Sequence, residues 1–176
     1  MAGMLYATPG PNFVGHQSIY QFVNADGADP GTVCGPAAVA TVLANRGKIP
    51  KSVAGLQKIE KTYPPDVLSG ALGTSPGRVL RALKEYKMNY RKVDGQKGLE
   101  GALRSGAAAI ALIQNTAGLA GLGDGAHWFV IFGCDANGVH VTNYGFPPFI
   151  AWATFEPIWS APVPAATGMG SRAIAC

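Results

Sequence analysis

Gly31-Thr32-Val33-Cys34-Gly35-Pro36-Ala37-Ala38 is the stretch that decides how this 176-residue chain folds. It begins as a loop and continues into Val39-Ala40-Thr41-Val42-Leu43-Ala44, which is almost wholly apolar. Such a run predicts a helix that is buried on nearly all sides, with Pro36 in its first turn and Asn45-Arg46-Gly47 at its end. The pattern therefore places a single thiol at the start of a buried helix.

The position of Cys34 has a chemical consequence. A helix start presents unpaired N–H groups and the positive end of the helix dipole, and both favour a thiolate over a thiol. Gly31 and Gly35 leave room for a substrate carbonyl to approach the sulfur. We therefore expect Cys34 to be poised for ionisation; the alternative is that it is a small buried apolar residue, as most lone cysteines are.

The length and the cysteine count fit a single domain, residues 1–176, with irregular tails at 1–16 and 161–176. Cys34, Cys134 and Cys176 are too scattered for a disulfide framework or a metal site, so we expect no metal and no cofactor. Residues 1–10 lack the pattern of a secretory signal, and the apolar run 107–113 is too short to cross a bilayer. We expect a protein that is cytoplasmic or exported without a classical signal peptide, and not transmembrane.

The charge of +4 is unevenly distributed along the chain. Residues 46–97 hold twelve of the fourteen Lys and Arg residues and four of the ten acidic ones. Such a segment could attract an acidic partner or nucleic acid. No nucleic-acid motif accompanies it, so we interpret the basic residues as solvated helix faces and expect no nucleic-acid partner.

Helical patterns dominate before residue 106 and strand patterns after residue 107, which predicts an α+β domain with two unlike halves. Beyond the Cys34 helix, we expect helices over 52–63 and 74–86, and strands over 107–114, 127–135, 139–143 and 149–155. A cleft between the halves would place Cys34 on one wall and His127 on the other.

Cys34, His127 and Asn143 supply the groups that nucleophilic catalysis by a thiol requires. The thiol needs a base that takes its proton, and a third group that orients the base. Asp135 and Asp124 are alternative orienters, and a histidine such as His127, taken without the Cys34 block, is more often structural than catalytic.

Three blocks resemble the papain-like cysteine peptidases, and within them the compact bacterial branch that includes the double-glycine (bacteriocin leader) peptidases. They are Cys34-Gly35-Pro36-Ala37-Ala38, Ala126-His127-Trp128-Phe129-Val130-Ile131-Phe132-Gly133-Cys134-Asp135-Ala136-Asn137-Gly138-Val139, and Val141-Thr142-Asn143-Tyr144-Gly145. The resemblance implies a papain-like fold with an active-site cleft, and a covalent thioester on Cys34. His127 would then act as general base and acid, and Asn143 as orienter where the branch commonly carries aspartate.

The same resemblance implies further site residues. The oxyanion glutamine of the family would be Gln21, or else Gln17, because the usual position six residues before the cysteine is Ala28 here. Gly35 would lie beside the substrate, while Trp128 and Tyr144 would pack there or shield the bond between His127 and Asn143.

The sequence thus predicts a thiol protease that hydrolyses peptide bonds and takes a peptide or protein as its partner. An amidase, deamidase or acyltransferase on the same fold, for example one that acts on peptidoglycan amide bonds, is the first alternative. A catalytically inactive papain-like binding module is the second.

Overall fold

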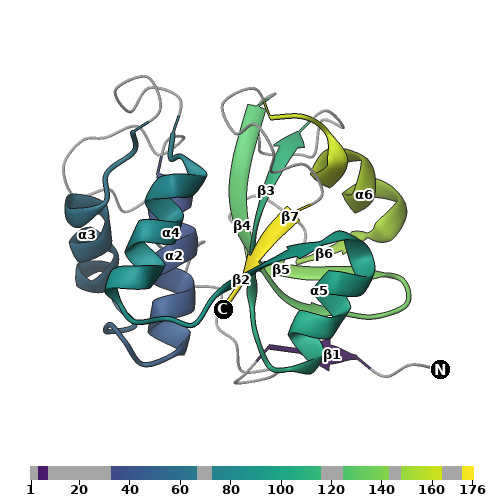
Figure 1. Ribbon diagram of the computed structural model, residues 1–176, viewed down its shortest axis with the longest axis horizontal. Helices are drawn as coiled ribbons and strands as arrows, with labels where there is room; N and C mark the ends of the chain where they lie inside the picture. The colour runs from purple at the N-terminus through teal and green to yellow at the C-terminus, as the bar shows by residue number, and fades with distance from the viewer. Residues whose placement is uncertain (1–3, 8–32, 67–72, 116–124, 143–147, 164–171) are drawn as a thin grey trace.

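The computed structural model describes residues 4–7, 33–66, 73–115, 125–142, 148–163 and 172–176 (Figure 1). The helices are α2 (Cys34–Asn45), α3 (Val53–Thr62), α4 (Pro76–Glu85), α5 (Gly95–Arg104) and α6 (Trp152–Ser160). The strands are β1 (Leu5–Tyr6), β2 (Arg91–Asp94), β3 (Ala109–Asn115), β4 (Gly125–Cys134), β5 (Gly138–Thr142), β6 (Phe149–Ala151) and β7 (Arg172–Ala175).

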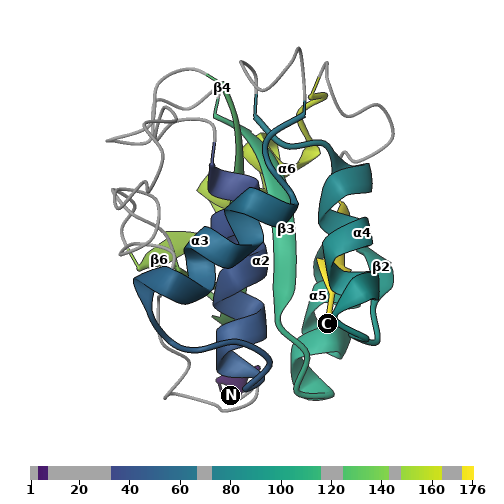
Figure 2. The same ribbon diagram turned by 90° about the vertical axis from the view of Figure 1, so that its left-hand side faces the viewer.

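The strands form one antiparallel sheet in the order β2-β7-β3-β4-β5-β6, and β1 pairs with the far end of β4. Helices cover both faces of this sheet. Helix α2 lies against one face with α3 and α4 outside it, as Figure 2 shows, and α5 and α6 lie on the other face. The α+β class with an N-terminal helical half and a C-terminal sheet half is confirmed.

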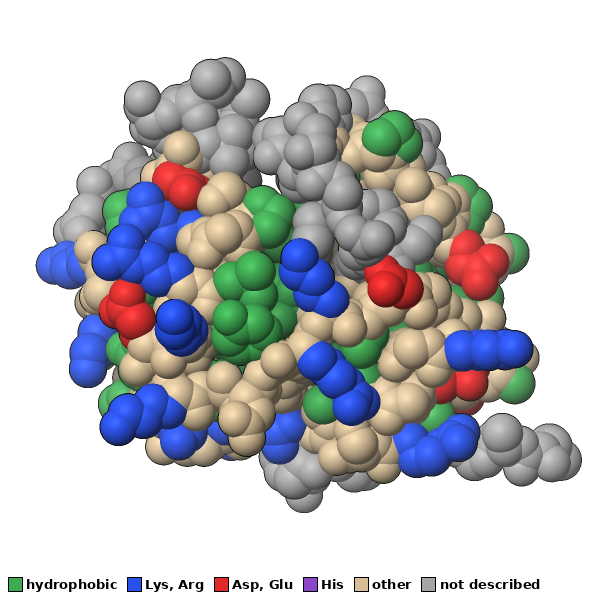
Figure 3. Space-filling model, viewed as in Figure 1, with side chains coloured by type: hydrophobic (Ala, Val, Ile, Leu, Met, Phe, Trp, Pro, Cys, Tyr) green, Lys and Arg blue, Asp and Glu red, His purple; other side chains and the backbone are tan. Residues whose placement is uncertain are grey.

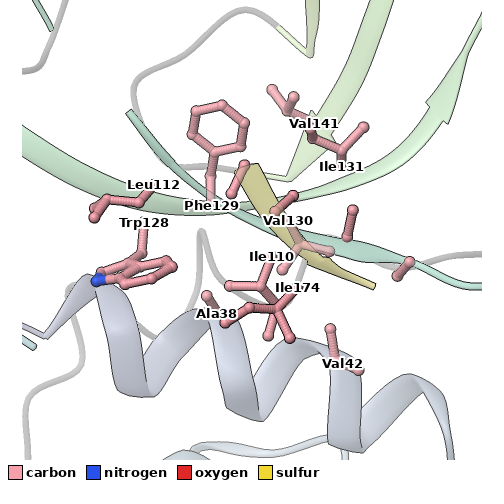
Figure 4. Packing of buried hydrophobic residues seen from close by; sticks show 14 of the residues in the cluster. Ala38, Val42, Ile110, Leu112, Trp128, Phe129, Val130, Ile131, Val141 and Ile174 are labelled. Atoms are coloured by element: carbon pink, nitrogen blue, oxygen red, sulfur yellow. The ribbon is translucent and has the colours of Figure 1, made fainter. Parts of the chain in front are cut away.

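Helix α2 is the buried helix that the sequence predicts, since every residue from Cys34 to Ala44 is buried. Alternation along β4 divides the core into two layers. Trp128 and Val130 point toward Ala38 and Val42 of α2, whereas Phe129 points to the opposite face (Figure 4). There the ring centroid of Phe129 lies 6.1 Å from that of Phe155 in α6. Helix α2 is thus held against the strand that carries His127.

The helices around α2 begin and end at the predicted signals. Ser52 caps α3, and Ser75 caps α4 just before Pro76. Gly47, with φ of +67°, follows the end of α2 in the left-handed conformation that glycine adopts without strain.

The predicted strand 149–155 is wrong beyond Ala151. The chain turns there into α6, because Trp152, Phe155 and Trp159 follow a helical spacing and contact one another. The Trp152 and Phe155 rings are tilted, with centroids 5.8 Å apart, and the Phe155 and Trp159 rings stack at 5.0 Å. Aromatic residues favour strands in isolation, and here packing on the sheet outweighs that preference.

The predicted irregular tails are also wrong where the structure describes them. Leu5–Tyr6 pair with Cys134 and Gly133 of β4. Arg172–Ala175 lie between β2 and β3 and pair with both. Ala173, Ile174 and Ala175 are buried there because small apolar side chains fit a strand covered on both faces.

Among the residues that the structure describes, no helix is long and apolar enough to cross a membrane. The 12 residues of α2 fall well short of the roughly 20 that a bilayer requires.

Candidate active site

The start of α2 meets β4 at the Cys34 sulfur. Cys34 is the first residue of the helix and is 3% exposed. Its Sγ accepts a hydrogen bond from the backbone N–H of Trp128, with a donor–acceptor distance of 3.5 Å. Trp128 directly follows His127, so the structure brings the sulfur to the histidine-bearing segment across 94 positions of sequence.

His127 and Trp128 lie near the N-terminal end of β4, and both are buried. His127 pairs in register with Ile113 of β3, and this pairing fixes its position along the strand direction. The Trp128 side chain turns toward α2, and its indole N–H donates to the carbonyl oxygen of Thr74 at 2.8 Å. Trp128 is therefore a packing residue on the side of β4 that faces α2.

Thr74 is a site residue that sequence reasoning missed. Its side chain lies so close to Gly35 that a Cβ on Gly35 would stand 2.4 Å from Thr74 Cβ. Glycine is thus required at position 35 by close packing. Thr74 is 6% exposed, and its Oγ1 has no hydrogen-bond partner within the described residues. The only sequence signal was the glycine itself, since a glycine inside a buried helix often marks a close approach.

Burial raises the pKa of the Cys34 thiol to about 11, although backbone N–H groups of Trp128, Gly35 and Cys34 act in the opposite direction. The expectation that the helix start poises Cys34 for ionisation is therefore wrong for this arrangement. A thiolate that is excluded from water loses more hydration free energy than the hydrogen bonds from these N–H groups supply.

Comparison with known proteins places the fold. No family model matches the sequence, and no curated protein matches it. The crystal structure of a candidate C39-like peptidase from Bacillus anthracis superposes with a TM-score of 0.65 at 16% identity, over 99% of this chain and 97% of that one. The chain has a C39-like, papain-like fold.

A double-glycine motif protease from an AMS/PCAT transporter, solved in complex with the leader peptide, also matches. It shares 17% identity over 80% of this chain and 81% of that one, with a TM-score of 0.49. The fold assignment depends on the first of these two structures.

Within the C39-like fold, Asp135 is excluded as the orienter of His127, because it follows the opposite end of β4. Its Oδ1 accepts the backbone N–H groups of Asn137 and Gly138, at 2.7 and 3.2 Å, and so shapes the hairpin turn. His140 Nε2 lies 3.9 Å from Asp135 Oδ2. The His140 ring lies near Phe132 and Phe149, and 25% of its side chain is exposed, whereas Val139 and Val141 on either side are buried.

The β4–β5 hairpin is irregular. The strands are unequal, and the register shifts between Ile131 and Gly133. Thr142, the last described residue of β5, lies opposite Val130. Asn143, Tyr144, Asp124, Gln21 and Gln17 fall outside the described residues.

The other two thiols are buried and do not lie at helix starts. Burial raises the pKa of Cys134 to about 11 and that of Cys176 to about 12. Cys176 is 6% exposed, because β7 carries it into the sheet. Across the described ranges, no group of three or more His, Cys, Asp and Glu could hold a metal ion.

Proposed function

We propose that this protein is a cysteine peptidase in which Cys34 is the nucleophile, His127 the general base and acid, and Asn143 the group that orients the imidazole. The observation that carries the proposal is the hydrogen bond from Trp128 N–H to Cys34 Sγ. It supports a reacting pair because it brings the sulfur to the backbone of the segment that carries the buried His127. The C39-like fold supports the same class of enzyme.

The raised pKa of Cys34 favours one order of events. With a pKa of about 11 the resting sulfur is a neutral thiol. In our proposal, His127 takes the thiol proton as Sγ attacks the peptide carbonyl, and a tetrahedral oxyanion forms. His127 then protonates the departing amine as the C–N bond breaks, which leaves a thioester on Cys34. Water, deprotonated by His127, cleaves the thioester and restores the thiol.

The start of α2 suits an oxyanion. Val33 precedes the helix and offers no side-chain cap, so the first N–H groups are not taken by a capping side chain. We propose the Cys34 N–H as one oxyanion donor and the Gln21 amide as the second. Gly35 and Tyr144 complete the proposed substrate side of the site.

The experiment is cleavage of a mixed peptide library at neutral pH, with products identified by mass spectrometry. We expect new peptide termini with the wild-type protein and with the Cys134→Ala control, and none with Cys34→Ala. His127→Ala should also abolish turnover. An acylated Cys34, seen in the intact mass after rapid acid quenching, would identify the thioester.

Other outcomes would assign a different activity. Release of ammonia without new termini would indicate a deamidase, and transfer of the acyl group to an added amine would indicate a transferase. Cleavage that persists in Cys34→Ala would overturn the proposal.

The deep burial and raised pKa of Cys34 also favour a second candidate, a papain-like module that binds peptides without cleaving them. In that case library peptides would bind the wild-type protein and Cys34→Ala equally, with neither acylation nor cleavage.

A further inference from the structure

Three helices of this protein end in the same backbone motif, and one of them departs from the usual residue. After α2, α4 and α5, the chain turns through Gly47, Lys87 and Gly106, each with positive φ. In each case the next N–H bonds back to the carbonyl five residues earlier, as with Met88 N–H to Leu83 O at 3.0 Å. This is the Schellman ending, whose left-handed position favours glycine. Only α4, among the described helices, has a bulky residue there, Lys87 with φ of +54°.

The lysine is not explained by the helix itself. A cation near a helix C-terminus is favourable, but Lys84 already lies in the last turn of α4. Glycine at position 87 would adopt the same φ without steric strain. Backbone strain that persists at an exposed position indicates that the side chain is retained for another reason.

Lys87 belongs to an exposed basic group with Lys84, Arg91 and Lys92. Within the described residues, no carboxylate forms a salt bridge with any of these four. The neighbouring basic residues are engaged: Arg81 pairs with Glu85 at 2.8 Å, and Arg78 pairs with Asp66 at 3.5 Å. Figure 3 shows Lys and Arg gathered on this face of the helical half.

An apolar feature accompanies the charges. Tyr90 is 40% exposed, and it is the large apolar side chain that stands out to solvent among the described residues. It borders a hollow of about 230 Å³. The hollow is lined by Asn89, Tyr90, Arg91, Ser105, Ala107 and Cys176. Its size suits one side chain of a partner, and Asn89 and Ser105 can bond to a peptide backbone.

We propose that the exposed basic residues Lys84, Lys87, Arg91 and Lys92, together with the hollow that Tyr90 and Arg91 line, form a docking surface for an acidic polypeptide segment that inserts one apolar side chain beside Tyr90. Charge complementarity favours this occupant. A nucleic acid is disfavoured because no nucleic-acid motif accompanies these residues in the sequence. A membrane surface would need a broader apolar face than one tyrosine.

The docking surface is separate from the thiol site and does not depend on the proposed function. It begins at the C-terminal end of α4, whereas Thr74, beside Gly35, immediately precedes the Ser75 cap at the other end. The helix has 10 residues, so the two ends lie roughly 15 Å apart.

The test measures binding of a fluorescein-labelled hexapeptide of Glu and Asp with one central Leu, by anisotropy at low salt. We expect binding that weakens as salt is added, and no binding of the matched Lys peptide. Lys87→Gly should weaken binding roughly two- to fivefold, as expected for one exposed charge pair, while raising the melting temperature. The double variant K84E/K87E should weaken it more than tenfold, and the control Lys58→Glu on α3 should not change it.

Lys87→Gly removes the side chain without destabilising the fold, so any loss of peptide binding in this variant can be attributed to the lysine. Unchanged peptide binding in Lys87→Gly would overturn the proposal, as would equal binding of the Lys peptide. Tighter binding of single-stranded RNA or of anionic phospholipid vesicles than of the acidic peptide would overturn the assigned occupant. The alkylation rate of Cys34 should be the same in all these variants, which separates this result from the fate of the peptidase proposal.

Discussion

The start of α2 differs from the starts of α3 and α4. Ser75 accepts the N–H of Arg78 at 3.2 Å, and Ser52 accepts that of Gly55 at 3.4 Å. Helix α2 follows Val33, whose buried side chain offers no acceptor for the first N–H groups of the helix. A missing cap costs about 1 kcal/mol of stability. Helices α3 and α4 are capped and pack around α2, which holds the thiol against β4. Helices α5 and α6 also lack a side-chain cap, so the cap separates α2 from its two helical neighbours and not from every other helix.

The largest expected effect comes from filling the space at the uncapped start. Gly35→Ala would place a Cβ against Thr74, and we expect a loss of about 1–3 kcal/mol or more in the free energy of unfolding, because the contact is with a buried branched side chain. Urea denaturation measures the loss. The control is Gly101→Ala, which meets no atom within 4 Å and should stabilise α5 by up to about 1 kcal/mol. Equal stability of the two variants would show that Thr74 can move away.

The second effect concerns ionisation. With a pKa of about 11, Cys34 should react with iodoacetamide at pH 7 roughly two orders of magnitude more slowly than an ordinary exposed thiol, and its rate should rise through pH 10. The measurement is the carbamidomethylation rate of Cys34 by peptide mass spectrometry across pH 5–10.5. A rate that is fast and flat below pH 7 would contradict the raised pKa and would indicate a preformed thiolate–imidazolium pair.

Signals carried by a few adjacent residues were readable from the sequence. Ser52 and Ser75 mark their helices, Gly47 follows the end of α2, and the long apolar run of β4 marks a strand. Each of these depends on local hydrogen bonds or on hydrophobic periodicity, so neighbouring residues suffice to predict it.

The features that depend on distant partners were not readable. Strand β7 has four residues, and its order comes from β2 and β3, about 80 and 60 positions away. The Thr74–Gly35 contact joins segments 39 positions apart. The pKa of Cys34 depends on burial by the whole fold, whereas the helix-start argument counted only the local N–H groups.

The third effect concerns Asp66, which binds Ser75, the N-cap of α4. Asp66 accepts hydrogen bonds from Ser75 N and Ser75 Oγ, both at 2.7 Å. Burial raises the pKa of Asp66, but these bonds and Arg78 outweigh it and leave the pKa lowered. Because the folded pKa lies below the unfolded one, this stability is present above the unfolded pKa, near 4, and is lost as pH falls through the folded pKa.

Asp66→Asn should therefore flatten the dependence of the unfolding free energy on pH below about pH 4. At pH 7 the unfolding free energy should fall only by what the charge-assisted bonds to Ser75 contribute. Ser75→Ala should remove the cap as well and cost about 1–2 kcal/mol at pH 7. Chemical denaturation from pH 2.5 to pH 7 measures both. An acid dependence unchanged in Asp66→Asn would mean that other carboxyl groups control it.

The smallest expected effect tests the polar atom beside the uncapped start. Thr74 Oγ1 is buried without a described partner, and the gap that it shares with Pro36, Val39 and Tyr63 has no room for water. Thr74→Val keeps the shape and the carbonyl that binds Trp128, so it should raise the free energy of unfolding by up to about 1 kcal/mol. A loss of stability would show that the hydroxyl has a partner in solution. If stability rises while peptide cleavage falls, the hydroxyl contributes to activity, and the start of α2 retains it at the expense of stability.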